Sequence, residues 1–258
     1  LQTEWRNDND TTVNCSFAST NAAGIAVEIK NAVQTGATPQ TPTLTGNSLT
    51  WVQIGSTLDA GGASRRLTLF RALGASPTAS VVVIDFAGIT QTGCAWSISE
   101  FSGVDTSGTN GSGAIIQFAT NVGTAVTSLA VTLASFASID NGCAGGFSTS
   151  ISSGITPGSG FTELGETSYA TPTTSLESEW KATNDTSVDT TFASASAEGI
   201  AVEIKAVPTG VSLSTKTASF DSIDRSTYTA GSITPTANTL QLAVICNEKD
   251  ATVPPATP

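Results

Sequence analysis

Short runs of alternating apolar and polar residues recur along this chain, separated by Gly, Asn, Asp, Ser and Pro. No segment has the 3.6-residue period of an amphipathic helix, whereas a period of two is typical of strands. Turn signals such as Asn110-Gly111 and Asn141-Gly142 lie between the runs. The pattern predicts strands over residues 49–54, 66–72, 80–86, 95–101, 114–119, 128–133, 142–148, 175–182, 187–192, 199–205 and 240–246.

Residues 1–30 and 176–205 are two copies of one segment. Aligned without a gap they agree at 18 of 30 positions, including Trp5 with Trp180, Phe17 with Phe192 and the shared ending GIAVEIK. Agreement of this extent indicates a tandem-repeat protein whose first copy starts in the middle of its own unit.

A weaker repeat relates residues 43–104 to residues 155–207. The phrases TLTGNSLTWVQIGS and CAWSISEFSGV correspond to ITPGSGFTELGETS and AEGIAVEIKAV. Phe70 is matched with Trp180 and Glu100 with Glu203. Each unit is therefore about 100 residues long, which is the size of one small sandwich.

The repeat divides the chain into four pieces. Residues 1–36 are the tail of one unit, residues 37–105 are a unit without its front strands, residues 106–207 are a complete unit, and residues 208–258 are front strands. The final ATVPPATP stops where TLTGNSLTW of residues 43–51 begins in the repeat's own order. We therefore expect residues 208–258 to complement residues 37–105, either within one chain or from a neighbouring copy.

The predicted fold is all-β, made of tandem antiparallel β-sandwich units of jelly-roll or immunoglobulin size. The incomplete units at the termini would be completed by strand complementation, which adds ladder hydrogen bonds and apolar burial to an open sheet. The expected assembly strand carries its apolar side chains at Leu240, Leu242, Val244 and Ile245.

Charge limits the partners that this chain is expected to bind. Only 12% of the residues are charged, the net charge is −11 and the pI is near 4.2, so the chain lacks the Lys and Arg clusters that nucleic acid requires. No apolar run approaches the roughly 18 residues that span a bilayer, so we expect no membrane insertion. The absence of methionine and of a leader is typical of a mature secreted protein, which predicts an extracellular, cell-surface or virion-surface location.

The chain contains no histidine, which excludes Ser-His-Asp and Cys-His nucleophilic sites and His-ligated zinc. We therefore expect no enzymatic activity. The four cysteines are widely spaced and form no C-x-x-C motif, which makes a zinc ribbon or redox motif unlikely in this pattern. They are either buried free thiols or members of one or two disulfides: Cys15, Cys94, Cys143 and Cys246.

Three glutamates recur at the ends of equivalent strands, at Glu28, Glu100 and Glu203. Alternation places Glu203 on the same face as Ala201 and Lys205, and we expect that face to be outward and solvated. A glycosidase requires two carboxyl groups in one cleft. One glutamate in every unit does not form such a pair.

Other polar groups suggest ligands only weakly. The Asp- and Asn-rich segments 7–10, 184–185 and 221–224 have oxygen ligands for calcium, but these residues also favour turns, so the prediction is no cofactor, with calcium as the alternative. Trp180 beside Glu179 has the chemistry of a sugar-stacking edge, although core packing is favoured. Glycosylation sequons begin at Asn9, Asn14, Asn110 and Asn184.

The order of four phrases resembles a known class of module. TLQLAVIC, GNSLTWVQI, LFRA and WSISEFSGV together resemble the tandem β-sandwich modules of uncharacterised secreted bacterial and phage-encoded surface proteins. The resemblance covers most of residues 37–258, and its motifs are structural, so it assigns no functional residue. This chain departs from such a module in register, because the front strands follow at 208–258 instead of preceding residue 43.

These observations predict a non-enzymatic extracellular structural protein, a subunit of a filament, surface layer or virion appendage. Its partners would be copies of itself in a head-to-tail homopolymer, since a heterologous contact of that kind propagates unless it closes into a ring. The alternative is a glycan-binding or adhesive array of β-sandwich modules. That alternative requires exposed aromatic side chains in a groove, whereas only 6% of the residues are aromatic.

Overall fold

The structure is a computed structural model of the chain. It describes residues 2–10, 12–15, 24–27, 39–60, 64–89, 91–170, 173–207, 212–217, 237 and 239–248. For residues 2–10, 12–15, 24–27, 92, 212–217 and 244–248 it describes the backbone and not the side chains.

Seventeen strands and one short 3-10 helix make up the described chain. In chain order they are β1 (Gln2–Asp10), β2 (Thr12–Cys15), β3 (Gly24–Val27), β4 (Thr43–Gly46), β5 (Leu49–Thr50), β6 (Val52–Leu58), β7 (Arg66–Ala72), β8 (Val82–Asp85), β9 (Gln91–Ser102), η1 (Ser112–Ala114), β10 (Ile115–Thr132), β11 (Gly142–Thr149), β12 (Thr156–Pro157), β13 (Thr162–Ala170), β14 (Thr173–Lys181), β15 (Ser187–Ile204), β16 (Ser212–Thr217) and β17 (Leu240–Glu248).

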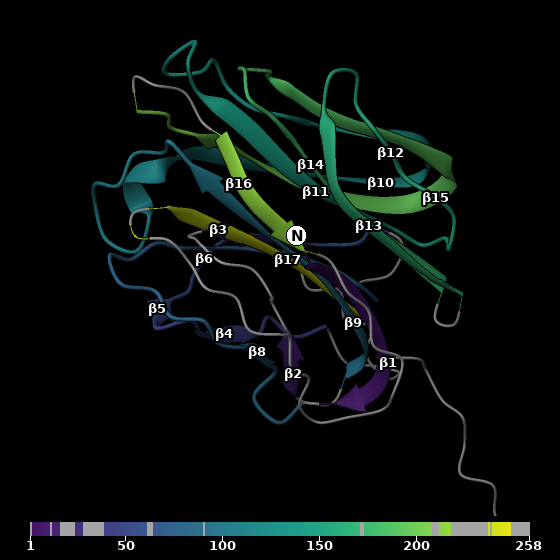
Figure 1. The fold of residues 1–258 in the computed structure, drawn as a ribbon. Helices are drawn as coiled ribbons and strands as arrows, with labels where there is room; N and C mark the ends of the chain where they lie inside the picture. The colour runs from purple at the N-terminus through teal and green to yellow at the C-terminus, as the bar shows by residue number, and fades with distance from the viewer. Residues whose placement is uncertain are drawn as a thin grey trace, which may run out of the picture.

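The strands form open sheets, which confirms the predicted all-β class. One sheet has the order β10-β15-β11-β14-β13, with β12 pairing β15, and occupies the upper part of Figure 1. A second has the order β1-β9-β17-β3, with β16 also pairing β9; a third has the order β2-β8-β4-β5, and β6 pairs with β7. Every pairing between described strands is antiparallel except that of β17 with β3.

The long strands β10 and β15 fold back on themselves. The Gln117 side-chain amide donates to the Ala134 carbonyl at 3.1 Å, although 17 residues of straight strand would separate these residues by about 55 Å. The register of β10 against β15 shifts between Gly123 and Ser128, and Ala125 has a φ of 54°. The paired strands therefore bend at this irregularity and contribute to two layers, where the alternation pattern predicted four separate strands.

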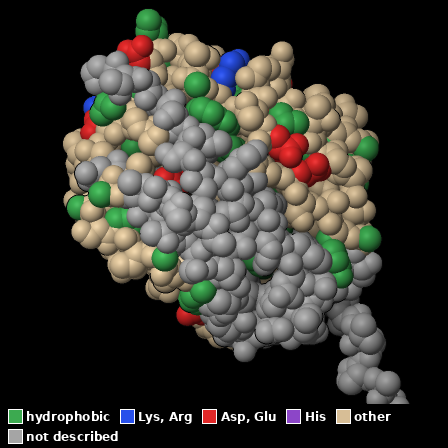
Figure 2. All heavy atoms as spheres, in the orientation of Figure 1, with side chains coloured by type: hydrophobic (Ala, Val, Ile, Leu, Met, Phe, Trp, Pro, Cys, Tyr) green, Lys and Arg blue, Asp and Glu red, His purple; other side chains and the backbone are tan. Residues whose placement is uncertain are grey.

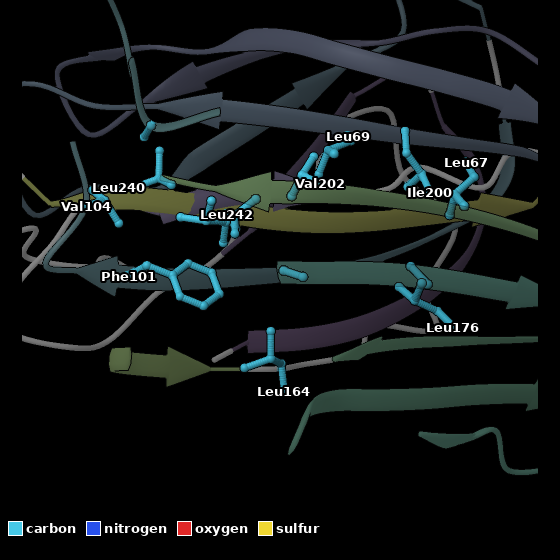
Figure 3. Close-up of a cluster of buried hydrophobic side chains, with 14 residues drawn as sticks. Leu67, Leu69, Phe101, Val104, Leu164, Leu176, Ile200, Val202, Leu240 and Leu242 are labelled. Carbon is cyan, nitrogen blue, oxygen red and sulfur yellow. The ribbon is translucent and has the colours of Figure 1, made fainter. Parts of the chain in front are cut away.

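Three clusters of buried hydrophobic side chains lie between the layers. The inner cluster joins the sheet of β9 and β17 to the sheet of β14 and β15 and includes Phe101, Leu176 and Val202 (Figure 3). A second cluster packs Trp96 of β9 against Ile84 of β8. A third lies between the two layers of the bent β10–β15 pair. The sheets are therefore stacked, and the sheets on either side of the inner cluster are covered on both faces.

Strand β11 shows the consequence of this stacking, since all eight of its residues are buried. Ala144 faces the inner cluster, whereas Cys143 and Phe147 face the third cluster. Small residues allow close approach at this position. A Cβ added at Gly199 would lie 2.7 Å from the Phe147 ring, so the ring packs directly on the neighbouring backbone.

Two hairpins share the same register. In β6–β7, Val52 pairs with Arg71 and a bulge follows between Gln53 and Gly55. In β13–β14, Thr162 pairs with Trp180 and a bulge follows between Glu163 and Gly165. This correspondence sets Arg71, not Phe70, beside Trp180, so the sequence match of Phe70 with Trp180 is wrong by one residue. The sequence comparison aligned the two aromatic side chains with each other, although they lie one register position apart.

The buried guanidinium of Arg65 connects the segment between β6 and β7 to strand β15. Arg65 is 5% exposed, and its Nε donates to Glu198 Oε1 at 3.3 Å while one terminal nitrogen donates to the Ser196 carbonyl at 3.1 Å. A terminal nitrogen also lies 3.4 Å from Asp59 Oδ2. Removal of one partner from such a cluster would leave a buried charge unpaired.

We expect Phe147→Ala to lower the free energy of unfolding by about 3–5 kcal/mol, because the ring is fully buried and its loss opens a cavity. Ile139→Ala is the control, since Ile139 is 80% exposed and its loss should cost less than about 0.5 kcal/mol. Urea unfolding followed by circular dichroism measures both. Equal losses in the two variants would contradict the stacked arrangement.

Candidate functional site

Strand β17 completes the sheet around β9 within one chain. It runs antiparallel to β9 over nine consecutive pairs, from Leu240 opposite Phe101 to Glu248 opposite Gly93. It also packs against β7. A segment that follows β9 by more than a hundred residues therefore lies between two strands of residues 37–105.

The predicted assembly strand contributes to the inner cluster. Leu240 is 0% exposed and Leu242 is 1% exposed, and both lie near Phe101 and Val104 in Figure 3. Burial of each leucine is worth about 1.5–3 kcal/mol. The backbones of Val244 and Ile245 continue the ladder opposite Ser97 and Trp96, and their side chains lie outside those described.

Strand β3 has the same register on β9 as β17 has. Gly24 and Gln241 are both set against Glu100, and Val27 and Val244 are both set against Ser97. The two segments are also parallel to each other, with Ile25 beside Leu242. Strands β3 and β17 therefore pair with the same four residues of β9, residues 97–100, in the same structure.

Glu203 is buried, which corrects the expectation that it faces solvent. It is 0% exposed and accepts three hydrogen bonds, from the Ala137 backbone N–H at 2.8 Å, from Asn141 Nδ2 at 2.6 Å and from Gln117 Nε2 at 2.6 Å. Its counterpart Glu100 is 1% exposed. The expectation assumed that one face of each sheet meets water, whereas these sheets have neighbours on both faces. Glu28 lies outside the described residues.

The Glu203 network closes one loop onto the strands. Asn141 donates to Glu203 and accepts from the Ala206 backbone N–H at 3.1 Å, which ties the loop before β11 to the end of β15. A cavity of about 440 Å³ opens beside it, lined in part by Asp105, Asp140 and Lys205. The Lys205–Asp105 ion pair, at 2.5 Å, holds the pKa of Asp105 at about 2. The lining of this cavity includes no aromatic side chain.

Four glutamates lie on one face of the β13–β14 hairpin. Glu163 pairs with Glu179, and Glu166 pairs with Glu177. Glu177 and Glu179 are 0% exposed, and neither oxygen of Glu177 has a hydrogen-bond partner in the structure. Glu179 accepts from the Gly158 backbone N–H at 2.9 Å, and Glu166 accepts from the Ile155 backbone N–H at 2.7 Å.

Burial raises the pKa of Glu177 and of Glu179. Burial away from water is the main cause that raises the pKa of Glu177 well above its ordinary value. The neighbouring carboxyl groups of Glu179 and of the two β13 glutamates raise it further. Loss of water also raises the pKa of Glu179 to about 8, against the opposing effect of the Gly158 N–H bond. In the β6–β7 hairpin the same register positions hold Gln53, Phe70, Ser56 and Thr68, so the carboxyl groups belong to one hairpin alone. Sequence reasoning singled out Glu179 only as a neighbour of Trp180; the alternation of Glu177 with Glu179 is the signal that could have located the cluster.

The carboxyl cluster is closed to substrate. Glu177 and Glu179 have no exposed surface, and neither lines the 440 Å³ cavity or a second cavity of about 330 Å³ beside Asn184. Within the described residues no group of three His, Cys, Asp or Glu side chains has the arrangement of a metal site. The cluster therefore bears on stability and its pH dependence.

Two of the four cysteines have described side chains, and both are buried. Cys143 is a free thiol, which agrees with the buried-thiol alternative, and its Sγ lies 3.8 Å from the Thr183 carbonyl. Burial raises the pKa of the Cys143 thiol to about 12. Cys94 belongs to the second cluster. The side chains of Cys15 and Cys246 lie outside those described, although the backbone of Cys246 pairs with Ala95.

The remaining predicted sites lie apart from one another. Asn184 is exposed, Asn110 is half-buried with a φ of 52°, and the side chains of Asn9 and Asn14 are outside those described. Asp185, a candidate calcium ligand, instead lies 2.7 Å from Lys181. Burial raises the Asp185 pKa, but hydrogen bonds from Lys181 and Ser187 lower it more, so it stays below its ordinary value. The Asp8–Asp10 side chains and residues 221–224 are not described.

The described tryptophan side chains take part in packing. Trp51 and Trp96 are 9% and 0% exposed. Trp180 is half-buried and meets the Phe101 ring edge-on, with centroids 5.6 Å apart. These positions favour core packing over sugar stacking for Trp180. Among the described residues no helix has the length and apolar character to cross a bilayer.

Comparison of the chain with protein-family models, with curated proteins and with solved structures gave no match.

Glu203→Gln should lower the free energy of unfolding by about 1–3 kcal/mol, because the new amide nitrogen meets donors and leaves buried groups unpaired. Asp140→Asn, at an exposed loop position, should change it by less than about 0.5 kcal/mol. Chemical unfolding of the two variants and the parent chain provides the comparison. A Glu203→Gln variant as stable as the parent would contradict the hydrogen-bond network.

The buried glutamates should make the protein more stable in mild acid than in mild base. Their folded-state pKa values lie above the ordinary 4.5, so their stabilising contribution is present below pH 4.5 and is lost as the pH rises towards the Glu179 value of about 8. The melting temperature should therefore fall between about pH 4 and pH 9, and Glu177→Gln with Glu179→Gln should flatten the fall. Asp140→Asn, at an exposed loop position, should leave the profile unchanged. A melting temperature that rises over this range would disprove the assignment.

Proposed function

We propose that this chain is a non-enzymatic extracellular structural protein, a subunit of a filament, surface layer or virion appendage. Copies of the chain assemble head-to-tail by exchanging β17, which leaves its own β9 and pairs with β9 of a neighbour. The observation that carries the proposal is the position of β17: a strand remote in sequence completes a sheet and its apolar core. Exchange of such an element between identical chains preserves every contact that it makes within one chain.

The overlap of β3 and β17 on β9 supports strand exchange. Their sequences at the shared positions are Ile25-Ala26-Val27 and Leu242-Ala243-Val244, which are nearly the same. Both segments pair with residues 97–100 of β9, so the chain carries two donor strands of similar sequence for one acceptor segment. The donor left over in one copy is then available to an acceptor in the next.

The chemistry of the described residues also suits a structural role. The side chains of Glu177 and Glu179 are sealed from solvent, and the 440 Å³ cavity is flanked by the Lys205–Asp105 ion pair. The coloured part of the surface in Figure 2 shows few red or blue side chains among the tan. Trp51 and Trp96 are buried, and among the described aromatic side chains only Phe118 is exposed, which disfavours the alternative of a glycan-binding array.

A single substitution tests the proposed exchange. Ala95 lies opposite the native Cys246 in the β9–β17 ladder, so Ala95→Cys places two cysteines on paired positions. We expect mild oxidation during assembly to give a ladder of disulfide-linked multimers on a non-reducing gel, growing with protein concentration. Electron microscopy of the parent chain over the same concentrations should show filaments.

The matched control is Ala95→Cys combined with Cys246→Ser, which should give no ladder. Intramolecular cross-linking alone at every concentration would show that β17 stays in its own chain and would overturn the proposal. Removal of residues 208–258 should abolish the multimers or unfold the monomer, because the inner cluster loses Leu240 and Leu242.

A further inference from the structure

We propose that the first half of β10 pairs antiparallel with the same segment of a second copy of this chain. The contact joins identical surfaces, so it makes a closed two-fold pair. It is separate from the exchange of β17 and does not depend on it.

Strand β10 is an edge of its sheet. It pairs with β15 on one side, and no other described strand pairs with it. From Gln117 to Gly123 the pairing with β15 runs without a shift in register. The Val122 backbone N–H donates to Asn121 Oδ1 at 2.9 Å, so it points away from β15, and by alternation the backbone groups of Phe118 and Thr120 point the same way.

Apolar side chains accompany this open edge. Ile116, Phe118 and Val122 are 42%, 49% and 40% exposed, and they are three of the five large hydrophobic side chains that are exposed in the described part of the chain. Phe118 rests against β6, where a Cβ added at Gly55 would lie 2.5 Å from its ring. The exposed edge is therefore a continuation of the inner layer and not an isolated loop.

Charge indicates that the occupant is another copy. Residues 106–139 contain no Asp, Glu, Lys or Arg, although the chain as a whole has a net charge of −11. Two such chains repel each other over most of their surface, and β10 is where they meet without bringing carboxylates together. Edge strands that avoid pairing usually carry lysine, proline or an inward charge, and residues 117–123 carry none of these.

An antiparallel pair of identical strands satisfies both edges at once. Each copy donates and accepts through the same backbone positions, and the two sheets become one continuous sheet. The exposed Phe118 and Val122 of each copy then lie on one face of that sheet, where cross-strand apolar neighbours add to the backbone ladder.

The test measures the weight-average mass of the full chain by sedimentation equilibrium at several concentrations. Thr120→Lys places a charge at an exposed position of the edge, and Phe118→Lys does the same at the apolar centre. Both should halve the mass relative to the parent chain at the same concentration. Ile139→Lys is the control, because it adds the same charge at a more exposed apolar residue outside β10 and should leave the mass unchanged.

Two results would overturn the proposal: a parent chain that stays at 26.0 kDa at every concentration, or an unchanged mass in Thr120→Lys. Circular dichroism identifies loss of folding in Phe118→Lys, and in that case Thr120→Lys alone decides. The Ala95→Cys ladder, measured in the Thr120→Lys background, should persist if β17 exchange is also correct. If the multimer ladder disappears in the Thr120→Lys background but is present in the parent background, β17 exchange requires the β10 contact. That result would overturn the independence of the two contacts.

Discussion

Face-to-face packing of two sheets across the inner cluster is the constraint on which the rest of this structure depends. Leucine, isoleucine, valine and phenylalanine side chains from β7, β9, β14, β15 and β17 meet there and exclude water. Each of the two sheets has a further layer on its other side, so their central strands keep no solvated face. Every polar side chain on a covered strand then requires a partner or a proton, because an unpaired buried charge is costly.

The glutamates respond to this constraint in two ways. The Glu203 carboxylate accepts hydrogen bonds from two side-chain amides and one backbone N–H. These bonds replace the ones that water would make to an exposed carboxylate. Glu177 has no such donors, and burial raises its pKa, which favours the neutral acid. Glutamates of one sheet therefore differ in the hydrogen-bond donors around them. The predicted pH dependence of stability follows from the raised pKa values of Glu177 and Glu179.

Local periodicity was sufficient to predict the class of fold and the course of several strands, since residues 66–72 coincide with β7 and residues 142–148 lie within β11. Local periodicity could not predict which side chains are buried. Alternation places Glu203 and Val202 on opposite faces of the strand, but it does not show how many layers stack on those faces. Periodicity also predicted two shorter strands in place of each of β10 and β15, because a bulge interrupts the alternation without ending the strand. The buried glutamate pair escaped prediction because its chemistry depends on the absence of nearby donors, which only the three-dimensional arrangement reveals.

The same stacking explains why strand edges, and not faces, are the candidate sites of interaction. A face covered by another layer is unavailable to a partner, which leaves strand edges such as β10 and the side of β9 that pairs with β17. Two segments of similar sequence pair with that side of β9, whereas among the described strands only β15 pairs with β10. A donor that differs from its acceptor produces head-to-tail growth, and a self-complementary edge produces a two-fold pair. Used together, the first contact would extend a polymer and the second would join two polymers side by side.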